Sequence, residues 1–129
     1  MENKTKKVLI IDDDQTFQKL LPGKIAELGY SVISSFDGED GYNKIVNEKP
    51  DLILLDIKMP KVDGIELLKR INLNKDIPKI PILLTSNLST VDYISEAVTL
   101  GVKGYIVKSS ESLENIVKEV DSILKSQSF

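Results

Sequence analysis

The chain has 129 residues, of which 41% are hydrophobic and 29% are charged, and its formal net charge is −3. This length and apolar content suffice for one domain with its own core, and the weakly acidic balance argues against a nucleic-acid-binding protein. Cysteine and histidine are both absent, which excludes disulfides, thiolate or imidazole metal sites and the commonest general base. Any chemistry must therefore rest on carboxylates, hydroxyls and lysines.

Short apolar runs alternate with helical patterns along the chain. The runs cover residues 8–11, 30–33, 52–55, 82–84 and 105–107. Apolar residues at helical spacing fill the gaps between them, most clearly from Leu113 to Leu124 and most weakly over 39–48. Regular alternation of strands and helices predicts an α/β fold, a parallel five-stranded sheet with five helices.

The predicted strands differ in their exposure. The runs at 8–11, 52–55 and 82–84 are apolar at every position, which is typical of strands covered by helices on both faces. "YSVIS" is interrupted by polar residues and "GYIVK" is short, so these two are expected at the sheet edges. Edge strands that are second and fifth in sequence match the flavodoxin-like doubly wound order 2-1-3-4-5, which binds ligands beyond the carboxyl ends of its strands.

Side chains that can cap a helix precede each predicted helix. They are Asp14, Asp37, Asp63, Ser89 and Ser112. Gly29 and Gly101 stand where the end of a helix takes a left-handed residue. Pro22 falls inside the first predicted helix. We expect a kink or break there, because proline costs about 3 kcal/mol in a helix interior.

Polar side chains stand at the carboxyl ends of four predicted strands. Asp12, Asp13 and Asp14 follow the first strand, and Asp56, Thr85 and Lys108 end the third, fourth and fifth. These ends share one edge of a parallel sheet, so the side chains should converge. Grouped carboxylates need a cation or protons to neutralise them, and an all-oxygen site favours a hard cation such as Mg²⁺ or Mn²⁺. Asp56, at the end of the middle strand, is the best candidate for a nucleophile that forms an aspartyl-phosphate.

Four motifs, in order, resemble those of a known family. "VLIIDDD", "PDLILLDIKMPKVDG", "PILLTS" and "GYIVK" are similar to the motifs of response regulator receiver domains of two-component systems, as in chemotaxis regulators. The resemblance runs from Lys7 to Lys125. It implies a single receiver domain over residues 1–129, with its core at about 7–125 and no output domain on this chain.

The resemblance also implies the chemistry. Asp56 would accept a phosphoryl group from a phosphohistidine on a histidine kinase or phosphotransfer protein. Asp12 and Asp13 would match the family's acidic pair, with Asp13 and Asp56 binding Mg²⁺ directly and the backbone carbonyl of Lys58 as a further ligand. The chain would be a phosphoacceptor that assists its own phosphoryl transfer and slow hydrolysis, rather than an enzyme acting on other molecules.

Further family positions concern signalling. Thr85 would hydrogen-bond one phosphoryl oxygen and Lys108 would pair with another. Tyr105 matches an aromatic switch that moves inward with Thr85 and controls the surface of the fourth helix, fifth strand and fifth helix. Lys58 and Asn87 match variable positions that tune phosphoryl lifetime. The output would be contact with a downstream protein, and phosphorylation could also link two copies of the chain in a homodimer.

No nucleic-acid or membrane partner is expected. The longest apolar runs fall short of the roughly 7–15 residues of a secretory signal and the roughly 20 of a membrane span. A cytoplasmic location is therefore the expectation. One residue departs from the family pattern: Ser109 stands where a proline usually follows the lysine. Because a non-proline cis bond costs roughly 3 kcal/mol, we expect a trans Lys108–Ser109 bond with Lys108 still reaching the site.

Two alternatives remain open. "DDDQT" also resembles the first motif of haloacid-dehalogenase-type phosphatases, with Asp12, Asp14 and Thr16 as the matching residues. That family needs a late acidic pair on another strand, which is missing here, and it leaves Asp56 without a role. The second alternative is a passive receiver-like domain that only binds a protein partner.

Overall fold

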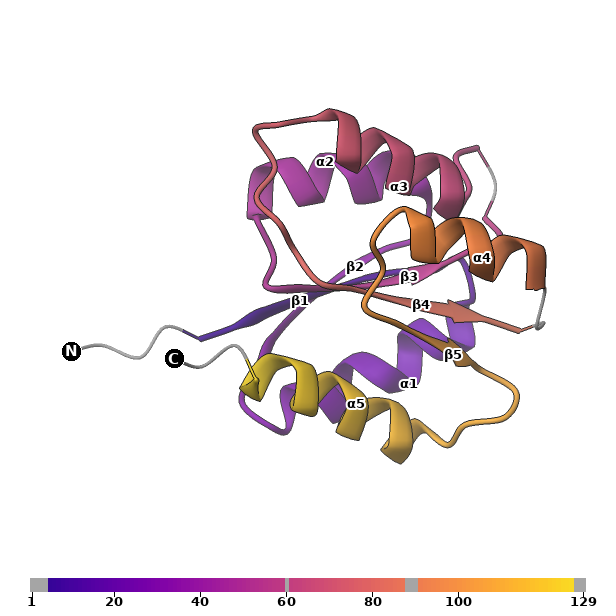
Figure 1. Cartoon of the computed structure of the whole chain (residues 1–129). Coiled ribbons are helices and arrows are strands. Elements are labelled where there is room, and N and C mark those ends of the chain that lie inside the picture. The colour runs from indigo at the N-terminus through magenta and orange to yellow at the C-terminus, as the bar shows by residue number, and fades with distance from the viewer. Residues whose placement is uncertain (1–4, 60, 88–90, 127–129) are drawn as a thin grey trace.

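The computed structural model describes residues 5–59, 61–87 and 91–126. Strands and helices alternate along the whole of this length (Figure 1). The strands are β1 (Lys7–Ile11), β2 (Ser31–Ser35), β3 (Leu52–Asp56), β4 (Ile82–Ser86) and β5 (Gly104–Val107). The helices are α1 (Gln15–Ala26), α2 (Gly38–Glu48), α3 (Gly64–Leu73), α4 (Val91–Thr99) and α5 (Leu113–Lys125). Each predicted element is present, with ends shifted by a few residues.

The strands form one parallel sheet in the order β2-β1-β3-β4-β5, so the predicted fold class is confirmed. Every residue of β3 and β4 is buried, whereas β2 and β5 are mostly half-buried, as expected for edge strands. The pairing register places Asp56 directly beside Thr85. The sheet therefore aligns the strand ends that the sequence marked as polar.

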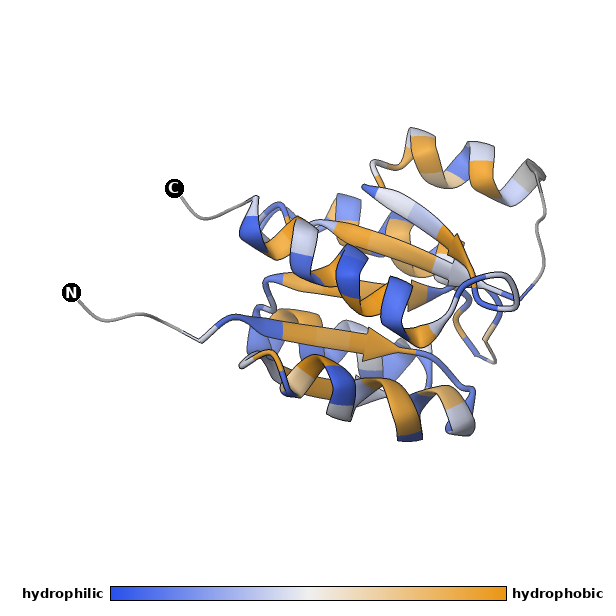
Figure 2. Ribbon diagram, turned by 90° about the horizontal axis from the view of Figure 1, so that it is seen from below, coloured by the Kyte–Doolittle hydropathy of each residue, from blue (hydrophilic) through white to orange (hydrophobic). Residues whose placement is uncertain are grey.

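Helices cover both faces of the sheet. Figure 1 shows α1 and α5 on one side and α2, α3 and α4 on the other. Along β1, Val8 and Ile10 pack with α1 and α5, while Leu9 and Ile11 pack with the other three helices. Successive strand side chains point to opposite faces, so two cores require an uninterrupted apolar strand. Figure 2 shows hydrophobic residues along most of the strands and a mixture of hydrophobic and polar residues along the helices that cover them.

Side-chain caps begin four of the helices at the predicted residues. Asp14, Asp37, Asp63 and Ser112 each accept a hydrogen bond from a backbone N–H three residues later. Gly29 and Gly101 have φ angles of 97° and 93°, a left-handed conformation that suits glycine. The remaining predicted cap, Ser89, lies outside the described residues.

Of the kink or break predicted at Pro22, the break is wrong, because α1 continues without interruption from Gln15 to Ala26. Proline removes one backbone hydrogen bond from the helix. Leu21 and Ile25 on either side of it are completely buried in the core, and burying each such side chain contributes about 1.5–3 kcal/mol. Tertiary packing of this helix face therefore outweighs the local cost of the proline.

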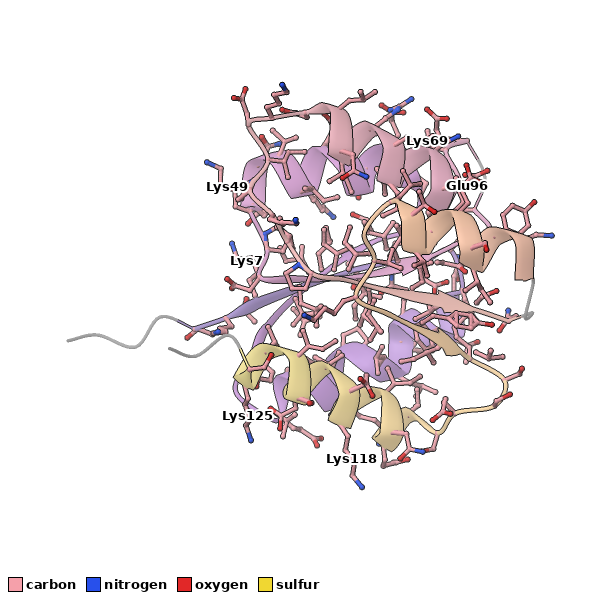
Figure 3. All side chains as sticks on the ribbon, in the orientation of Figure 1. Lys7, Lys49, Lys69, Glu96, Lys118 and Lys125 are labelled. Atoms are coloured by element: carbon pink, nitrogen blue, oxygen red, sulfur yellow. The ribbon has the colours of Figure 1, made fainter. Side chains whose placement is uncertain are left out.

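Charged side chains lie on the outside of the helices, and several of them join neighbouring elements. Lys69 on α3 and Glu96 on α4 approach within 3.2 Å, and Figure 3 shows the two side by side, whereas Lys118 and Lys125 point away from α5. Exposed pairs of this kind contribute roughly 0–1 kcal/mol each. Within the described residues, none of the helices combines the length and the hydrophobicity that crossing a membrane would require.

Candidate functional site

A pocket of about 210 Å³ opens at the carboxyl ends of the strands. Its lining combines acidic, hydroxyl, amide and lysine side chains from the ends of β1, β3, β4 and β5: Asp13, Asp14, Asp56, Ile57, Lys58, Ser86, Asn87 and Lys108. This is the edge at which doubly wound sheets bind ligands. The convergence expected from the sequence is therefore present for Asp13, Asp14, Asp56 and Lys108.

Three carboxylates form the acidic part of the site. Asp12, Asp13 and Asp56 each offer an oxygen atom, and the three oxygens lie within 4.8 Å of one another. Asp12 and Asp56 are buried, whereas Asp13 is exposed. The backbone fixes this arrangement, because the N–H of Asp12 donates to the carbonyl of Ser35 at 3.0 Å and extends the pairing of β1 with β2.

Burial and mutual repulsion both disfavour ionisation of the buried acids. Burial raises the pKa of Asp56 to about 7, and the nearby charge of Asp12 adds to the effect. Burial also raises the pKa of Asp12, against the opposing hydrogen bond from Lys108. One lysine does not neutralise this group of acids, so the site favours either protons or an added cation. An all-carboxylate donor set suits a hard divalent cation such as Mg²⁺.

Lys108 lies close to three of the carboxylates at this edge. Its Nζ is 2.8 Å from Asp12, 3.8 Å from Asp14 and 4.0 Å from Asp56. The same Nζ lies 4.7 Å from the centroid of the Phe17 ring, a cation–π distance. The Lys108 side chain is only 5% exposed, so these contacts replace most of its hydration.

The backbone after Lys108 takes the predicted form. The peptide bond to Ser109 is trans, because no cis bond occurs in the part of the chain that the structure describes. The N–H of Lys108 donates to the carbonyl of Ser86, and the hydroxyl of Ser109 donates to the carbonyl of Asn87. These hydrogen bonds tie the segment after β5 to the end of β4 without a proline.

The three consecutive aspartates have different environments. Asp12 is buried and accepts hydrogen bonds from Lys108 and from the N–H of Asp14. Asp13 points into the pocket as an exposed carboxylate. Asp14 caps α1 by accepting from the N–H of Phe17 at 3.1 Å, which confirms its predicted role in helix initiation.

The remaining predicted residues divide between the pocket and its surroundings. Lys58 and Asn87 line the pocket as exposed side chains. Thr85 is 1% exposed and paired with Asp56 in the sheet, but the neighbouring Ser86 takes its place in the pocket lining. Tyr105 is half-buried on β5 and lines a separate groove between β5 and α5.

Two residues of α1 approach the site without having been predicted to do so. Phe17 is one of the apolar residues at helical spacing in the first predicted helix, and its ring lies beneath Lys108. Gln18 is buried and donates to backbone carbonyls at the end of β1. In the sequence, Gln18 stands three positions before Leu21 and seven before Ile25, both of which are buried. This helical spacing directs the polar side chain of Gln18 toward the core.

Comparison with known proteins agrees with this geometry. A family model described as the response regulator receiver domain matches residues 8–121. Among curated relatives, a probable transcriptional regulator, ycf27, from Guillardia theta is 37% identical over 116 residues, which are 88% of this chain and 44% of the relative. The alkaline phosphatase synthesis transcriptional regulatory protein PhoP from Bacillus subtilis is 38% identical over 103 residues, which are 80% of this chain and 42% of the relative. The chain thus spans less than half the length of these two relatives.

Solved structures match over nearly the whole chain. A CheY-like response regulator receiver domain protein from Methanospirillum hungatei has a TM-score of 0.85 and 26% identity, covering 96% of this chain and 97% of that one. The phosphorylated cyanobacterial phytochrome response regulator RcpA has a TM-score of 0.83 and 27% identity, covering 98% of both chains. These structures contain the same arrangement of sheet and helices.

Proposed function

This chain belongs to the family of response regulator receiver domains of two-component signalling, and we propose that Asp56 is its phosphoacceptor. The observation that carries the proposal is the position of Asp56, whose carboxylate ends the middle strand and opens into the pocket between two further acids and Lys108. Asp12, the nucleophile under the phosphatase alternative, is completely buried and already bonded to Lys108. The geometry therefore favours Asp56 over Asp12 as the group that attacks.

The proposed donor is a phosphohistidine on a histidine kinase or phosphotransfer protein. A carboxylate oxygen of Asp56 attacks the phosphorus atom, the phosphorus–nitrogen bond breaks, and an aspartyl-phosphate forms. Lys108, now 4.0 Å from Asp56, would pair with one phosphoryl oxygen and Thr85 would donate to another. The domain would assist its own phosphorylation and slow hydrolysis in this way, with Lys58 and Asn87 at the pocket wall influencing how long the phosphoryl group persists.

The proposed metal is Mg²⁺, with Mn²⁺ as a substitute. Asp13 and Asp56 would bind it directly, Asp12 would support it, and the backbone carbonyl of Lys58 would be a further ligand. Two observations support this metal site. Three carboxylate oxygens lie within 4.8 Å of one another, and the burial of Asp56 disfavours its ionisation unless a cation is added. When bound, the ion would neutralise these acids and the incoming phosphoryl oxygens.

Substitutions at adjacent aspartates separate metal binding from helix capping. Asp13→Asn is expected to weaken Mg²⁺ binding at least about tenfold, because it removes a charged ligand. Asp14→Ser keeps an oxygen that can cap α1 and should leave the affinity within about threefold. Isothermal titration with MgCl₂ measures both. A larger loss with Asp14→Ser than with Asp13→Asn would contradict the proposed ligand assignment.

Phosphorylation would act on a distant surface by a shift of population. The phosphoryl group adds negative charge and acceptor oxygens at Asp56, and Thr85 and Tyr105 would follow it. Tyr105 lies on β5, so its movement would alter the surface formed by α4, β5 and α5. We propose that this surface contacts a downstream protein or a second copy of the chain, and that residues 1–129 act as a single receiver domain.

Direct phosphorylation tests the proposal. The chain is incubated with Mg²⁺ and acetyl phosphate and then examined by intact-mass spectrometry, with omission of Mg²⁺ as the control. We expect one added phosphoryl group per chain with Mg²⁺ and little without it. A chain that binds Mg²⁺ but gains no mass would support the passive protein-binding alternative.

A further inference from the structure

The side chain of Gln18 joins the ends of two strands behind the acidic pair. Its Nε2 lies 3.0, 3.1 and 2.9 Å from the carbonyl oxygens of Ile10, Asp12 and Ser35, and its two N–H groups donate to these three acceptors, with one N–H shared. The Ser35 carbonyl also accepts from the N–H of Asp12. Gln18 therefore fixes the main chain on both sides of Ile11, the last residue of β1, directly before the three aspartates.

Only one side of the Gln18 amide is satisfied in the core. Gln18 is buried, yet its Oε1 has no hydrogen-bond partner among the described residues. The free-energy cost of burying this acceptor without a partner offsets the stabilisation from the hydrogen bonds that the amide N–H groups donate. The amide N–H groups satisfy carbonyls at the ends of β1 and β2, so an apolar side chain here would leave those carbonyls without this donor. The amide therefore fixes the main chain of both strand ends beside the site.

We infer that Gln18 is a positioning residue for the acidic pair. A divalent cation attracts the carboxylates of Asp12 and Asp13, and their main chain must resist this force if the site is to keep its shape. By fixing the Asp12 carbonyl, Gln18 holds both carboxylates at the pocket before the cation binds. The inference rests on the proposed function of the same site, and it concerns the affinity for the cation rather than the chemistry at Asp56.

Gln18→Met tests the inference, because methionine has a similar length and no N–H donor. Ile25→Val is the matched control, since it removes one buried methyl group from the same helix two turns away. We expect Gln18→Met to weaken Mg²⁺ binding about tenfold in titrations with MgCl₂ alone, as for outer-shell partners of metal ligands. The Mg²⁺ concentration that gives half-maximal phosphorylation by acetyl phosphate should rise by the same factor, while the rate at saturating Mg²⁺ stays within about twofold of wild type.

The outcomes distinguish this inference from the proposed function. If wild type binds Mg²⁺ and gains phosphate but Gln18→Met binds equally well, the positioning role is refuted and the proposed function stands. An equal loss in Ile25→Val would show that general destabilisation is the cause. If wild type binds no Mg²⁺, both fail. Should Gln18→Met not fold, Gln18→Asn repeats the test with a side chain too short to reach the three carbonyls. Failure of both variants to fold would show a purely structural role.

Discussion

Replacing Asp56 with asparagine is expected to lower phosphoryl uptake at least about a thousandfold, because the amide lacks the nucleophilic carboxylate oxygen. The substitution preserves the size and position of a side chain that is only 9% exposed, so the pocket should keep its shape. Uptake from acetyl phosphate in the presence of Mg²⁺, followed by intact mass, measures the loss.

Two controls make this result specific. Asp76→Asn changes an exposed acid in the loop before β4, at the amino ends of the strands and away from the pocket. This variant should leave the uptake unchanged. Asp12→Asn addresses the phosphatase alternative, in which Asp12 is the nucleophile and Asp56 has no role. Normal uptake by Asp56→Asn together with complete loss in Asp12→Asn would overturn the receiver assignment of Asp56.

In the absence of divalent cations, raising the pH from about 4 to about 7 is expected to destabilise the protein through Asp56. The pKa of this carboxyl is about 7 in the folded chain, against 3.8 as the ordinary value. Between these values the folded state retains a proton that the unfolded state has released. Stability from this group is therefore present at low pH and is lost as the pH rises, by up to about 4 kcal/mol.

Comparison with Asp56→Asn isolates this contribution from the other carboxylates. Urea unfolding gives the free energy of unfolding of both proteins at a series of pH values. The value for the variant should rise relative to that of wild type between about pH 4 and pH 7, with no further relative rise above that range. Mg²⁺ should raise the free energy of unfolding of wild type far more than that of the variant, because an ion that binds the folded state stabilises that state. A difference between the two proteins that does not change with pH would contradict the raised pKa of Asp56.

Much of the fold and the outline of the site followed from the sequence. Uninterrupted apolar runs indicated central strands, and interrupted or short ones indicated edges, because helices on both faces exclude polar residues from the middle of such a sheet. This pattern gave the strand order that the structure confirms. Because parallel strands end at one edge, Asp56 and Lys108 were expected to be close, although 52 positions separate 56 from 108.

Local capping rules were equally informative. Asp14 could be separated from Asp12 and Asp13 because a helix was expected to begin directly after it, and its carboxylate does cap α1. Capping depends on atoms within about one turn of the helix, so it can be predicted without knowledge of the rest of the molecule. The trans bond before Ser109 followed in the same way from local peptide energetics.

Only the tertiary structure decided the features that depend on packing between distant segments. Pro22 remains inside α1 because buried neighbours outweigh its local cost. Phe17 contacts Lys108, and Gln18 contacts Ser35, only because α1 packs beside the ends of the strands. The burial that raises the pKa of Asp56 likewise arises from all the surrounding elements together. The sequence alone thus determined which chemical groups meet at this edge, whereas three-dimensional packing determined how each one is held and charged.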